Sequence, residues 1–364
     1  MPVTTWERTR LRSTASDLTQ LNFGHLDCLL SDIGLWQHAE GCIPHQWHGY
    51  SIDDEARGLI VGLRYWEAGI EPRLNERLAR VCFKFIEDAA NSDGRSPGRY
   101  HNFCNAKGHW LDSVGSDDSF GRTFWGLGVA HAVNAPFAPR RAVECLLRDS
   151  LPAISRMDPH YLRARAFVIL GLAAARIADD QIRLLANSLE DAYKNCADEN
   201  WRWFEDQMTY CNPRLPQALF IAARISPENN RYREIATSSL DFLLAKTRNE
   251  QGSYNPIGNS RLTEAGWFTR SDAHPPRFDQ QPVDAGALVE CCVDAYKTTG
   301  DPRFRQAAWD AFGWYFGKNT HGLHVYNPET GGVSDALTPF GLNRNQGAES
   351  VLSVHMAYLA LHTI

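Results

Sequence analysis

Hydrophobic residues recur along the whole chain at the spacing of α-helices, and the apolar stretches are of two kinds. In the first kind, such as the stretch that follows Pro72, charged residues lie off a single apolar stripe. In the second kind, such as residues 118–131 and 161–177, nearly every position is apolar or small. A helix with one apolar stripe covers a core from outside, whereas a helix that is apolar all round is buried on every side. The pattern therefore predicts amphipathic outer helices that alternate with buried inner helices.

The periodicity and the turn signals predict an all-α chain of about twelve helices. Caps and prolines mark several ends, as where Asp301 precedes Pro302 at a helix start. The predicted helices are Asn22–His38, Ile52–Glu67, a third after Pro72, a fourth from Asp118 to about His131, a fifth that ends near Asp149, Tyr161–Ile177, Asp179–Asn195, Pro213–Ile225, a ninth through Tyr232 and Leu243, Pro282–Thr298, an eleventh from Pro302 to about Phe316, and Gln346–His362.

The links between the predicted helices differ in length. Links that follow an apolar helix are short, whereas links that precede one are mostly long, polar and rich in aromatic residues, such as residues 91–117 and 248–281. A double ring of helices, an (α/α)6 toroid, accounts for both regularities. Its long loops would meet at one mouth, over the N-termini of the inner helices, where ligand sites are expected. An open α-solenoid would share the helical pattern but would not need long loops on one side only.

Composition limits the classes of function. With 364 residues, 43% of them hydrophobic, the chain can bury a large core, and we expect one toroid domain at 21–364 behind an N-terminal extension at 1–20. A net charge of −6 without a basic block argues against nucleic acid and anionic membranes as partners. No apolar run reaches the roughly 18 residues of a membrane span, and no secretory signal is recognised. These features predict a cytoplasmic protein. They do not determine whether it forms homo-oligomers.

Neither the cysteines nor the histidines have the spacing of a metal site. The nine cysteines form no C-x-x-C pair, and the thirteen histidines form no H-E-x-x-H motif. Reduced core thiols are the expected state of the cysteines. The fingerprints of nucleotide-binding loops and of serine hydrolases are also absent. We therefore expect neither a metal nor a cofactor.

Paired acids at the starts of predicted inner helices are the main candidates for chemistry. Asp53 and Asp54 are followed one turn later by Arg57, and the pair at residues 117–118 is followed in the same way by Arg122. A helix N-terminus favours carboxylates, so each pair also fits a structural cap with a salt bridge. An arginine there could equally bind ligand hydroxyls. The recurrence of the pair at one expected rim favours a functional site.

Further acids complete the candidate set. Glu205 and Asp206 lie among Trp201, Trp203 and Phe204, where desolvation would raise a carboxyl pKa as a general acid requires. Asp54 and Asp118 lie at helix starts, where the helix dipole lowers the pKa, while the acid directly before each one acts in the opposite direction. We expect one of them to be the base or nucleophile. The candidate catalytic residues are Asp54, Asp118, Glu205, Asp206 and Glu349. We expect Asp54, Asp118, Glu205, Asp279 and Glu349 to line one cavity.

Aromatic rings and amides in the long loops suit a ligand with many hydroxyl groups. Turn chemistry is the alternative for any single amide. We expect Trp47, Trp203 and Trp267 to be partly exposed in the cavity. The candidate substrate-binding residues are Trp47, His48, Tyr50, Asp53, Arg57, His101, Asn102, Asp117, Arg122, Trp125, Trp203, Asn212, Arg214, Trp267, Asp279, Gln281, Asn343, Asn345 and Gln346.

Several of these motifs carry a resemblance to a known family. From about Leu21 to its end, the chain resembles an (α/α)6-toroid family that is found fused behind family-4-type glycosyltransferase domains and near genes for β-mannoside phosphorylases. The transferase domain is absent, since no Rossmann-like β/α pattern occurs. The arrangement of acids is also similar to that of unsaturated glucuronyl hydrolases, which use two aspartates that would match Asp54 and Asp118. The residues that carry the family resemblance are Gln37-His38, His48–Arg57, Arg99–Asn102, Asp117–Arg122 and Gly341–Glu349.

The residues and the resemblance together predict a glycoside hydrolase, with a mannose-containing substrate implied by the resemblance. A pair of carboxyl groups would flank the glycosidic bond, one protonating the leaving oxygen and the other activating water or attacking the sugar. Two other functions remain open. A sugar epimerase or isomerase on the same fold would need histidine bases that face the pocket. A glycan-binding protein would keep the aromatic rings without facing acids.

Overall fold

A computed structural model describes residues 21–90, 96–249, 252–259 and 266–364, so the predicted N-terminal extension lies outside the described residues. Twelve α-helices occur in these ranges, and none of them is both long and apolar enough to cross a membrane. The helices are α2 (Gly24–Leu29), α3 (Ile52–Glu67), α4 (Pro72–Ala89), α5 (Asp117–Val133), α6 (Arg140–Ile154), α7 (Leu162–Ala175), α8 (Asp179–Cys196), α9 (Arg214–Ile225), α10 (Asn230–Lys246), α11 (Pro282–Thr299), α12 (Pro302–Gly313) and α13 (Ala348–Leu361).

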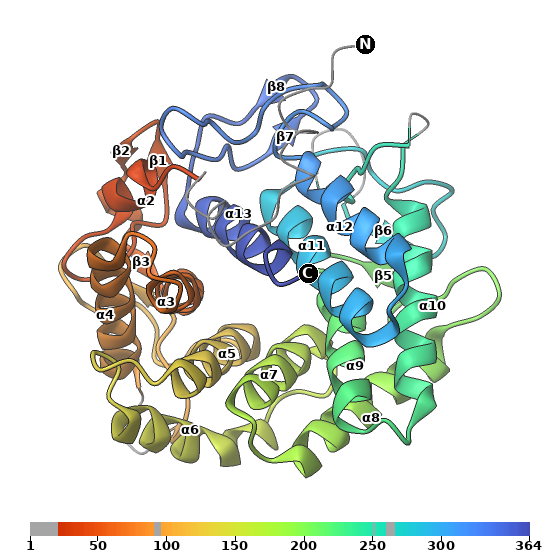
Figure 1. Ribbon diagram of the computed structural model, residues 1–364, viewed down its shortest axis with the longest axis horizontal. Helices are drawn as coiled ribbons and strands as arrows, with labels where there is room; N and C mark the ends of the chain where they lie inside the picture. Colours follow the sequence, from red (N-terminus) through yellow and green to blue (C-terminus); the bar gives the residue numbers. More distant parts are fainter. Residues whose placement is uncertain (1–20, 91–95, 250–251, 260–265) are drawn as a thin grey trace.

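The helices form a double ring, as the alternation of apolar and amphipathic stretches predicts (Figure 1). The inner ring consists of α3, α5, α7, α9, α11 and α13. The outer helices α4, α6, α8, α10 and α12 cover it, and α13 packs against α3 to close the ring. The predicted all-α toroid is confirmed.

Inner helices are apolar all round because they pack on both sides. Helix α7 buries residues on every face, and α5 does so from Ser119 to Ala130. The backbones of α5 and α7 approach closely where a Cβ atom on Gly128 would collide with the carbonyl group of Gly171. Outer helix α4 instead buries one stripe that includes Leu78, Cys82 and Phe85.

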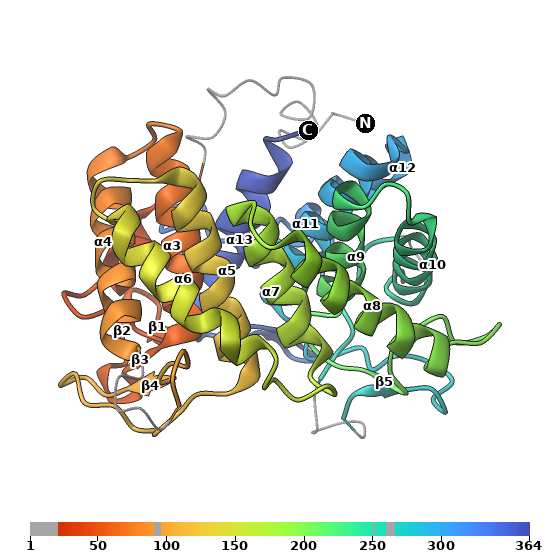
Figure 2. The same cartoon turned by 90° about the horizontal axis from the view of Figure 1, so that it is seen from below.

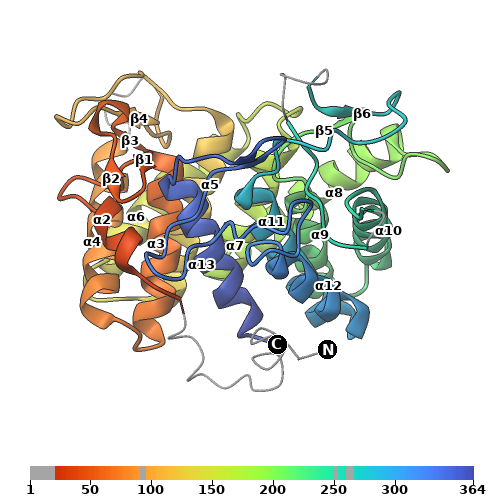
Figure 3. The ribbon, with the colours of Figure 1, turned by 90° about the horizontal axis from the view of Figure 1, so that it is seen from above.

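The long links all lie at the N-terminal ends of the inner helices, as Figures 2 and 3 show. Short antiparallel strand pairs connect these loops to one another, and two of the pairs join loops that belong to different helical hairpins. The loops therefore support each other around one mouth of the toroid. The pairs are β1 (Ala39–Glu40) with β2 (Ile43–Pro44), β3 (Tyr50–Ser51) with β4 (Phe103–Cys104), β5 (Gln207–Met208) with β6 (Phe268–Thr269), and β7 (Leu337–Thr338) with β8 (Gly341–Leu342).

The first predicted helix is the main error in the assignment of elements. Instead of Asn22–His38, the chain is helical only in α2, and residues 46–48 form a single 3₁₀ turn. The hydroxyl of Ser31 accepts the N–H groups of Ile33 and Gly34 and thereby forms a turn. The N–H of Leu35 then donates to the carboxyl group of Glu55 at 2.7 Å. The segment thus leaves the helix to run against α3.

Candidate active site

Side chains of the inner helices form successive layers along the interior of the toroid. Residues three or four apart lie on one face of a helix, so one inner helix can contribute to two layers. The first turns of α3, α5, α11 and α13 carry carboxyl groups. Arginines lie one turn further along α3 and α5 and in the first turns of α7 and α9. The carboxyl layer consists of Asp53, Asp54, Asp118, Asp284 and Glu349, and the arginine layer consists of Arg57, Arg122, Arg163 and Arg214.

Arg57 connects the first and last inner helices. Its guanidinium group forms an ion pair with Asp54 of α3 at 3.2 Å and another with Glu349 of α13 at 2.6 Å. The N-cap of α3 is Ser51, whose hydroxyl accepts the N–H of Asp54. Capping is therefore supplied by the serine, and the carboxyl group of Asp54 is available for the interior.

Arg122 connects the two acid pairs that the sequence singles out. It pairs with Asp118 of α5 at 2.8 Å and with Asp53 of α3 at 3.5 Å, and it lies over the ring of Phe167. Ser116 caps α5 in the way that the corresponding serine caps α3. The recurrent acid–arginine motif therefore produces one connected cluster of charges on neighbouring helices.

Burial shifts the pKa of Asp54 in the direction opposite to the one expected from the helix dipole. Desolvation raises the pKa of this carboxyl to about 7, with smaller contributions from Glu349 and Asp53 and opposition from Arg57. Burial likewise raises the pKa of Asp53, against the cations Arg122 and Arg57. The prediction that the helix dipole lowers the pKa of Asp54 is therefore wrong, because loss of hydration outweighs the dipole.

Asp284, in the first turn of α11, belongs to the same layer and was missed in the sequence. Burial raises its pKa to about 7, Glu349 raises it further, and the nearby backbone N–H groups of residues 211–212 act in the opposite direction. An acid in the first turn of an inner helix is the signal that marks Asp54 and Asp118. The same criterion would have found Asp284, two positions after Pro282.

Three carboxyl oxygens in this layer are buried without a hydrogen-bond donor among the described residues. They are the Oδ1 atoms of Asp53, Asp118 and Asp284, which lie on three different inner helices. A buried acceptor without a partner costs about 1–3 kcal/mol unless water or a ligand satisfies it. Together with the ion pairs around Arg57 and Arg122, these oxygens define a cluster suited to a ligand with several donors. We call Asp53, Asp54, Asp118, Asp284 and Glu349, with their arginines, the mouth cluster.

Glu205 lies in an ionic setting that differs from the predicted one. Its carboxylate pairs with Arg163 of α7 at 2.8 Å, and Arg163 also donates to the carbonyl of Tyr210. The ring of Tyr210 lies beneath Arg163 and near Trp267, which is partly exposed. Glu205 is therefore paired with a cation instead of being enclosed by aromatic rings.

Trp203 and Asp206, two other predicted residues on the loop of Glu205, do not belong to the mouth cluster. Trp203 is fully buried and packs edge-on against Phe204, so the prediction of an exposed binding surface there is wrong. The large apolar area of the indole is used in the core. Asp206 is 86% exposed and lies 3.7 Å from Arg270 beside the β5–β6 pair, on the outer side of the loop. No ion pair or hydrogen bond joins Asp206 to the mouth cluster within the described residues.

Replacing Trp203 by alanine should therefore destabilise the protein rather than act on binding alone. Removal of a large buried aromatic side chain typically costs about 3–5 kcal/mol. Chemical denaturation of the wild type and the variant would measure this loss. A matched Trp47→Ala change, at a ring that is 75% exposed, should cost less than about 1 kcal/mol. Similar stabilities for the two variants would contradict the assignment of Trp203 to the core.

Several predicted binding residues have structural partners. Tyr50 is buried and stacks on Trp36, and Asp117 pairs with Arg99 at 2.6 Å and accepts the N–H of residue 158. The prediction that Tyr50 contacts ligand is wrong because its ring packs in the core. The carboxylate of Asp117 holds two segments of the chain together.

The predicted amides also serve the loops. The side chain of Asn212 accepts from Arg163 and bonds the backbone of residue 209 in both directions. Asn345 accepts the N–H of Ala39 and donates to His38, while the backbone of Gln346 bonds residues 25 and 39. These bonds join the last long loop to the N-terminal segment. Turn and loop chemistry, the alternative noted above, accounts for them.

Other predicted residues lie on the loops with some exposure, and their part in binding stays a prediction. Trp47 and His48 form the exposed 3₁₀ turn, where the two rings are 5.6 Å apart. His101 stacks on Trp110 and bonds the carbonyl of residue 112. Partly or fully exposed candidates are also Asn102, Asp279, Gln281 and Asn343, and burial raises the pKa of Asp279.

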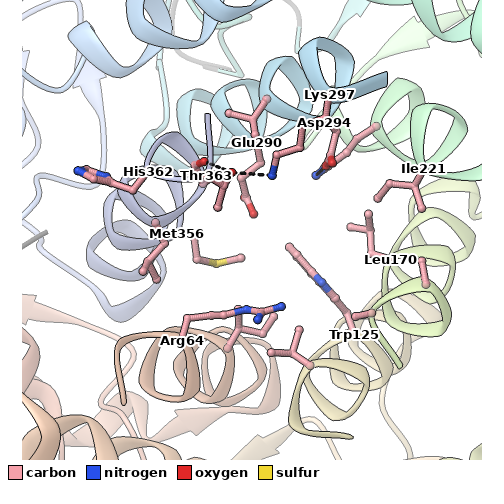
Figure 4. Close-up of a pocket in the computed structure, with 18 of the residues that line it drawn as sticks. Arg64, Trp125, Leu170, Ile221, Glu290, Asp294, Lys297, Met356, His362 and Thr363 are labelled. Carbon is pink, nitrogen blue, oxygen red and sulfur yellow. Dashed lines mark hydrogen bonds between the residues drawn. The ribbon is translucent and has the colours of Figure 1, made fainter. Parts of the chain in front are cut away.

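Trp125 and Arg214 lie deeper than predicted. Arg214 pairs with Glu290 at 2.5 Å and covers the ring of Trp125 at 4.8 Å. Trp125 and Glu290 line a cavity of about 540 Å³ that does not include the mouth cluster (Figure 4). This cavity lies among the C-terminal halves of the inner helices, at the end of the toroid opposite the long loops. The prediction that Trp125 belongs to the mouth is therefore wrong.

No group of three or more His, Cys, Asp or Glu side chains with metal-binding geometry occurs in the described ranges. Four carboxyl groups of the mouth cluster, those of Asp53, Asp54, Asp118 and Glu349, are paired with arginines.

Comparisons with known proteins address the fold. No protein-family profile and no curated protein sequence matches the chain. A cellobiose 2-epimerase from Spirochaeta thermophila aligns with a TM-score of 0.73 at 13% identity, over 99% of this chain and 98% of its own. A D-mannose isomerase aligns over the whole of both chains, with a TM-score of 0.72 at 12% identity.

A third structure belongs to a hydrolase. It is an α-1,6-mannanase of Salegentibacter sp., solved with α-1,6-mannotetrose as a variant made inactive by replacing two consecutive aspartates with alanine. It aligns with a TM-score of 0.61 at 11% identity, over 96% of this chain and 98% of its own. At these identities the likeness concerns the fold alone. The chain has the all-α (α/α)6-toroid fold, which it shares with both epimerases and hydrolases.

Proposed function

We propose that the protein is a carbohydrate-active enzyme, and that it hydrolyses a glycosidic bond at the mouth cluster. The observation that carries the proposal is the set of buried, donor-free oxygens on Asp53, Asp118 and Asp284. Sugar hydroxyl groups are donors that would satisfy such oxygens. The structural likeness to epimerases and mannanases supports a sugar substrate in general.

The two carboxyl environments at the mouth suit opposite roles in hydrolysis. Asp284, with its pKa raised to about 7 and one free oxygen, is our candidate for the acid that protonates the leaving oxygen. Asp118, paired with Arg122 at 2.8 Å, is our candidate for the ionised carboxylate that activates water or attacks the anomeric carbon. Arg57 and Arg122 oppose the effect of burial on the pKa of Asp53, and Arg57 does the same for Asp54.

The consecutive acids favour this role. The mannanase was inactivated by replacing two consecutive aspartates, and this chain has two such pairs, Asp53–Asp54 and Asp117–Asp118, at the starts of neighbouring inner helices. Both that mannanase and the mannose isomerase act on mannose or its polymers according to their names. We therefore propose a mannose-containing substrate, in agreement with the family resemblance.

Epimerisation or isomerisation of a sugar is the second candidate, and one histidine favours it. The Nδ1 atom of His38 lies 2.7 Å from the amide of Asn345 and 3.9 Å from Asp335. Hydrogen bonding to Asp335 raises the pKa of His38, and the charges of Asp54 and Glu349 act in the same direction. His38 therefore lies near the mouth cluster and could move a proton.

The two histidines that lie within inner helices do not support this second candidate. His355, on inner helix α13, is fully buried and contacts Tyr65 and Phe23, and burial lowers its pKa to about 3. His131 lies in the last turn of α5, away from the mouth. Carboxyl groups thus outnumber histidines in the cluster, and this favours hydrolysis.

A screen of manno- and gluco-oligosaccharides for new reducing ends tests the proposal. The wild type should release reducing sugar from a mannose-containing substrate, and Asp118→Asn should lower that rate by about 10²–10⁴-fold. Asp206→Asn is the matched control, because Asp206 lies outside the mouth cluster, and it should keep near-normal turnover. Sugar binding without turnover would favour a glycan-binding protein. Equal activities of Asp118→Asn and Asp206→Asn would contradict the assigned site.

A further inference from the structure

The cavity at the far end of the toroid is separate from the mouth cluster. It is lined by the C-terminal halves of the inner helices, and the short links between inner and outer helices lie at this end. Trp125, Gln217 and Glu290 line it, while Arg214 lies on them from the side of the mouth. Its volume of about 540 Å³ falls within the range of small-molecule sites. We call this space the rear chamber.

Apolar side chains form much of the wall of the rear chamber. Leu170, Ile221, Val293 and Met356 come from four different inner helices, and the indole of Trp125 comes from a fifth. Figure 4 shows that Trp125, Arg64 and Lys297 are directed into the space from three helices. An apolar enclosure with a few convergent polar groups is the usual composition of a ligand site.

The charges of the rear chamber leave one cation without an acidic partner. Three arginines pair with the three acids of the wall: Arg64 with Glu67 at 3.2 Å, Arg224 with Asp294 at 2.8 Å, and Arg214 with Glu290 at 2.5 Å. Lys297 forms no ion pair with any described residue. Its ammonium group donates to the hydroxyl of Thr363 at 2.6 Å, which uses one of its three hydrogens.

Lys297 is also close to other cations. Burial lowers its pKa, and the positive charges of Arg224 and Arg64 lower it further, while Asp294 alone acts in the opposite direction. The side chain of Lys297 is exposed to solvent. An accessible ammonium group with free donors near two guanidinium groups is a favourable position for an anion. The bound anion would supply the partner that Lys297 lacks.

We propose that the rear chamber binds a small organic anion of monosaccharide size, with its phosphate or carboxylate on Lys297 and Arg64 and its body against the apolar wall. The proposal is independent of the reaction at the mouth. Phosphate and carboxylate share the required chemistry, because both accept charge-assisted hydrogen bonds from Lys and Arg. Neutral sugars of the same size lack the group that Lys297 would recognise.

Isothermal titration of the full chain with mannose 6-phosphate, glucuronate, inorganic phosphate and mannose tests this proposal. At least one of the two sugar anions should bind, and both mannose and inorganic phosphate should bind at least tenfold more weakly. Lys297→Met, which replaces the aliphatic part of the side chain and removes the ammonium group, should weaken binding by about tenfold or more, since a hydrogen bond to a charged group contributes about 1.5–3 kcal/mol. Lys297→Arg should restore most of the affinity.

Two controls locate the site. Lys84→Met removes an exposed lysine that pairs with Asp88 on outer helix α4, and it should leave the affinity unchanged. Asp118→Asn should also leave it unchanged, because that residue lies in the mouth cluster. The proposal is overturned if none of the anions binds, if Lys297→Met binds as tightly as the wild type, or if inorganic phosphate binds as tightly as the sugar anions. Loss of binding in Asp118→Asn would place the anion at the mouth and would also overturn it.

Discussion

Replacing Asp284 by asparagine should lower turnover by about 10²–10⁴-fold without unfolding the protein, since that is the usual loss when a general acid is removed. Asparagine has the shape of aspartate and keeps one acceptor, but it cannot donate the proton. In the wild type, activity that depends on protonated Asp284 should decline as the pH rises through about 7. Rates measured from pH 5 to pH 9, with the variant beside the wild type, would check both expectations.

The stability of the same variant gives a second readout. The direction of the pKa shift determines whether stability rises or falls with pH. The folded-state pKa of Asp284 is raised to about 7 from the ordinary value of 3.8. Between these values the unfolded chain ionises while the folded chain keeps its proton, so wild-type stability falls as the pH rises from about 4 to 7. Asparagine does not titrate. The melting temperature of the variant relative to the wild type should therefore be higher at pH 8 than at pH 4, and an unchanged difference would contradict the assigned burial.

Replacing Arg122 by methionine should cost about 3–5 kcal/mol of unfolding free energy, the usual loss when one partner of a buried ion pair is removed. Arg122 is buried between Asp53 and Asp118, which lie on two inner helices. Its removal leaves Asp53 and Asp118 without the cation that they share. Because protonation removes their negative charges, the loss should become smaller as the pH is lowered toward 4. Urea denaturation at pH 7.5 and pH 4.5 would measure it.

Arg303→Met is the matched control for this prediction. Arg303 also pairs with two aspartates, Asp241 and Asp301, but it is about half exposed on outer helix α12. Exposed ion pairs contribute about 0–1 kcal/mol, so the control should lose no more than about 1–2 kcal/mol with little dependence on pH. If Arg122→Met lost no more unfolding free energy than Arg303→Met, the stability of the mouth cluster would not depend on Arg122.

The sequence predicted the inner ring well because its signals are local. Helix α3 begins at Ile52 and ends at Glu67 as predicted, since Ser51 caps one end and the apolar pattern is continuous. Within each acid–arginine repeat, one turn of helix brings the two residues into contact, as Asp118 and Arg122 show. Spacing alone determines these contacts.

Features that depend on tertiary packing could not be predicted in the same way. The indole of Trp203 is surrounded by polar residues in the sequence, yet the fold buries it completely. The end of α2 depends on Ser31 and on the contact of Gly34 with Glu55, which belongs to another helix. The pKa of Asp54 reflects burial by the whole ring, which exceeds the local effect of the helix dipole. The errors at Trp203 and Asp54 concern how deeply a residue lies, and the error at α2 concerns a contact with another helix.

Proton NMR of the reaction in ²H₂O tests the central proposal most directly, because it separates hydrolysis from its main alternative. Hydrolysis of a mannose-containing oligosaccharide breaks the glycosidic bond and leaves the carbon-bound hydrogens untouched. Epimerisation or isomerisation at C2 removes a proton from that carbon and exchanges it with the solvent. We expect new reducing-end signals to appear with the H-2 signal fully retained, and to disappear in Asp284→Asn. Loss of the H-2 signal without bond cleavage would contradict the proposal and assign the mouth cluster to an epimerase or isomerase.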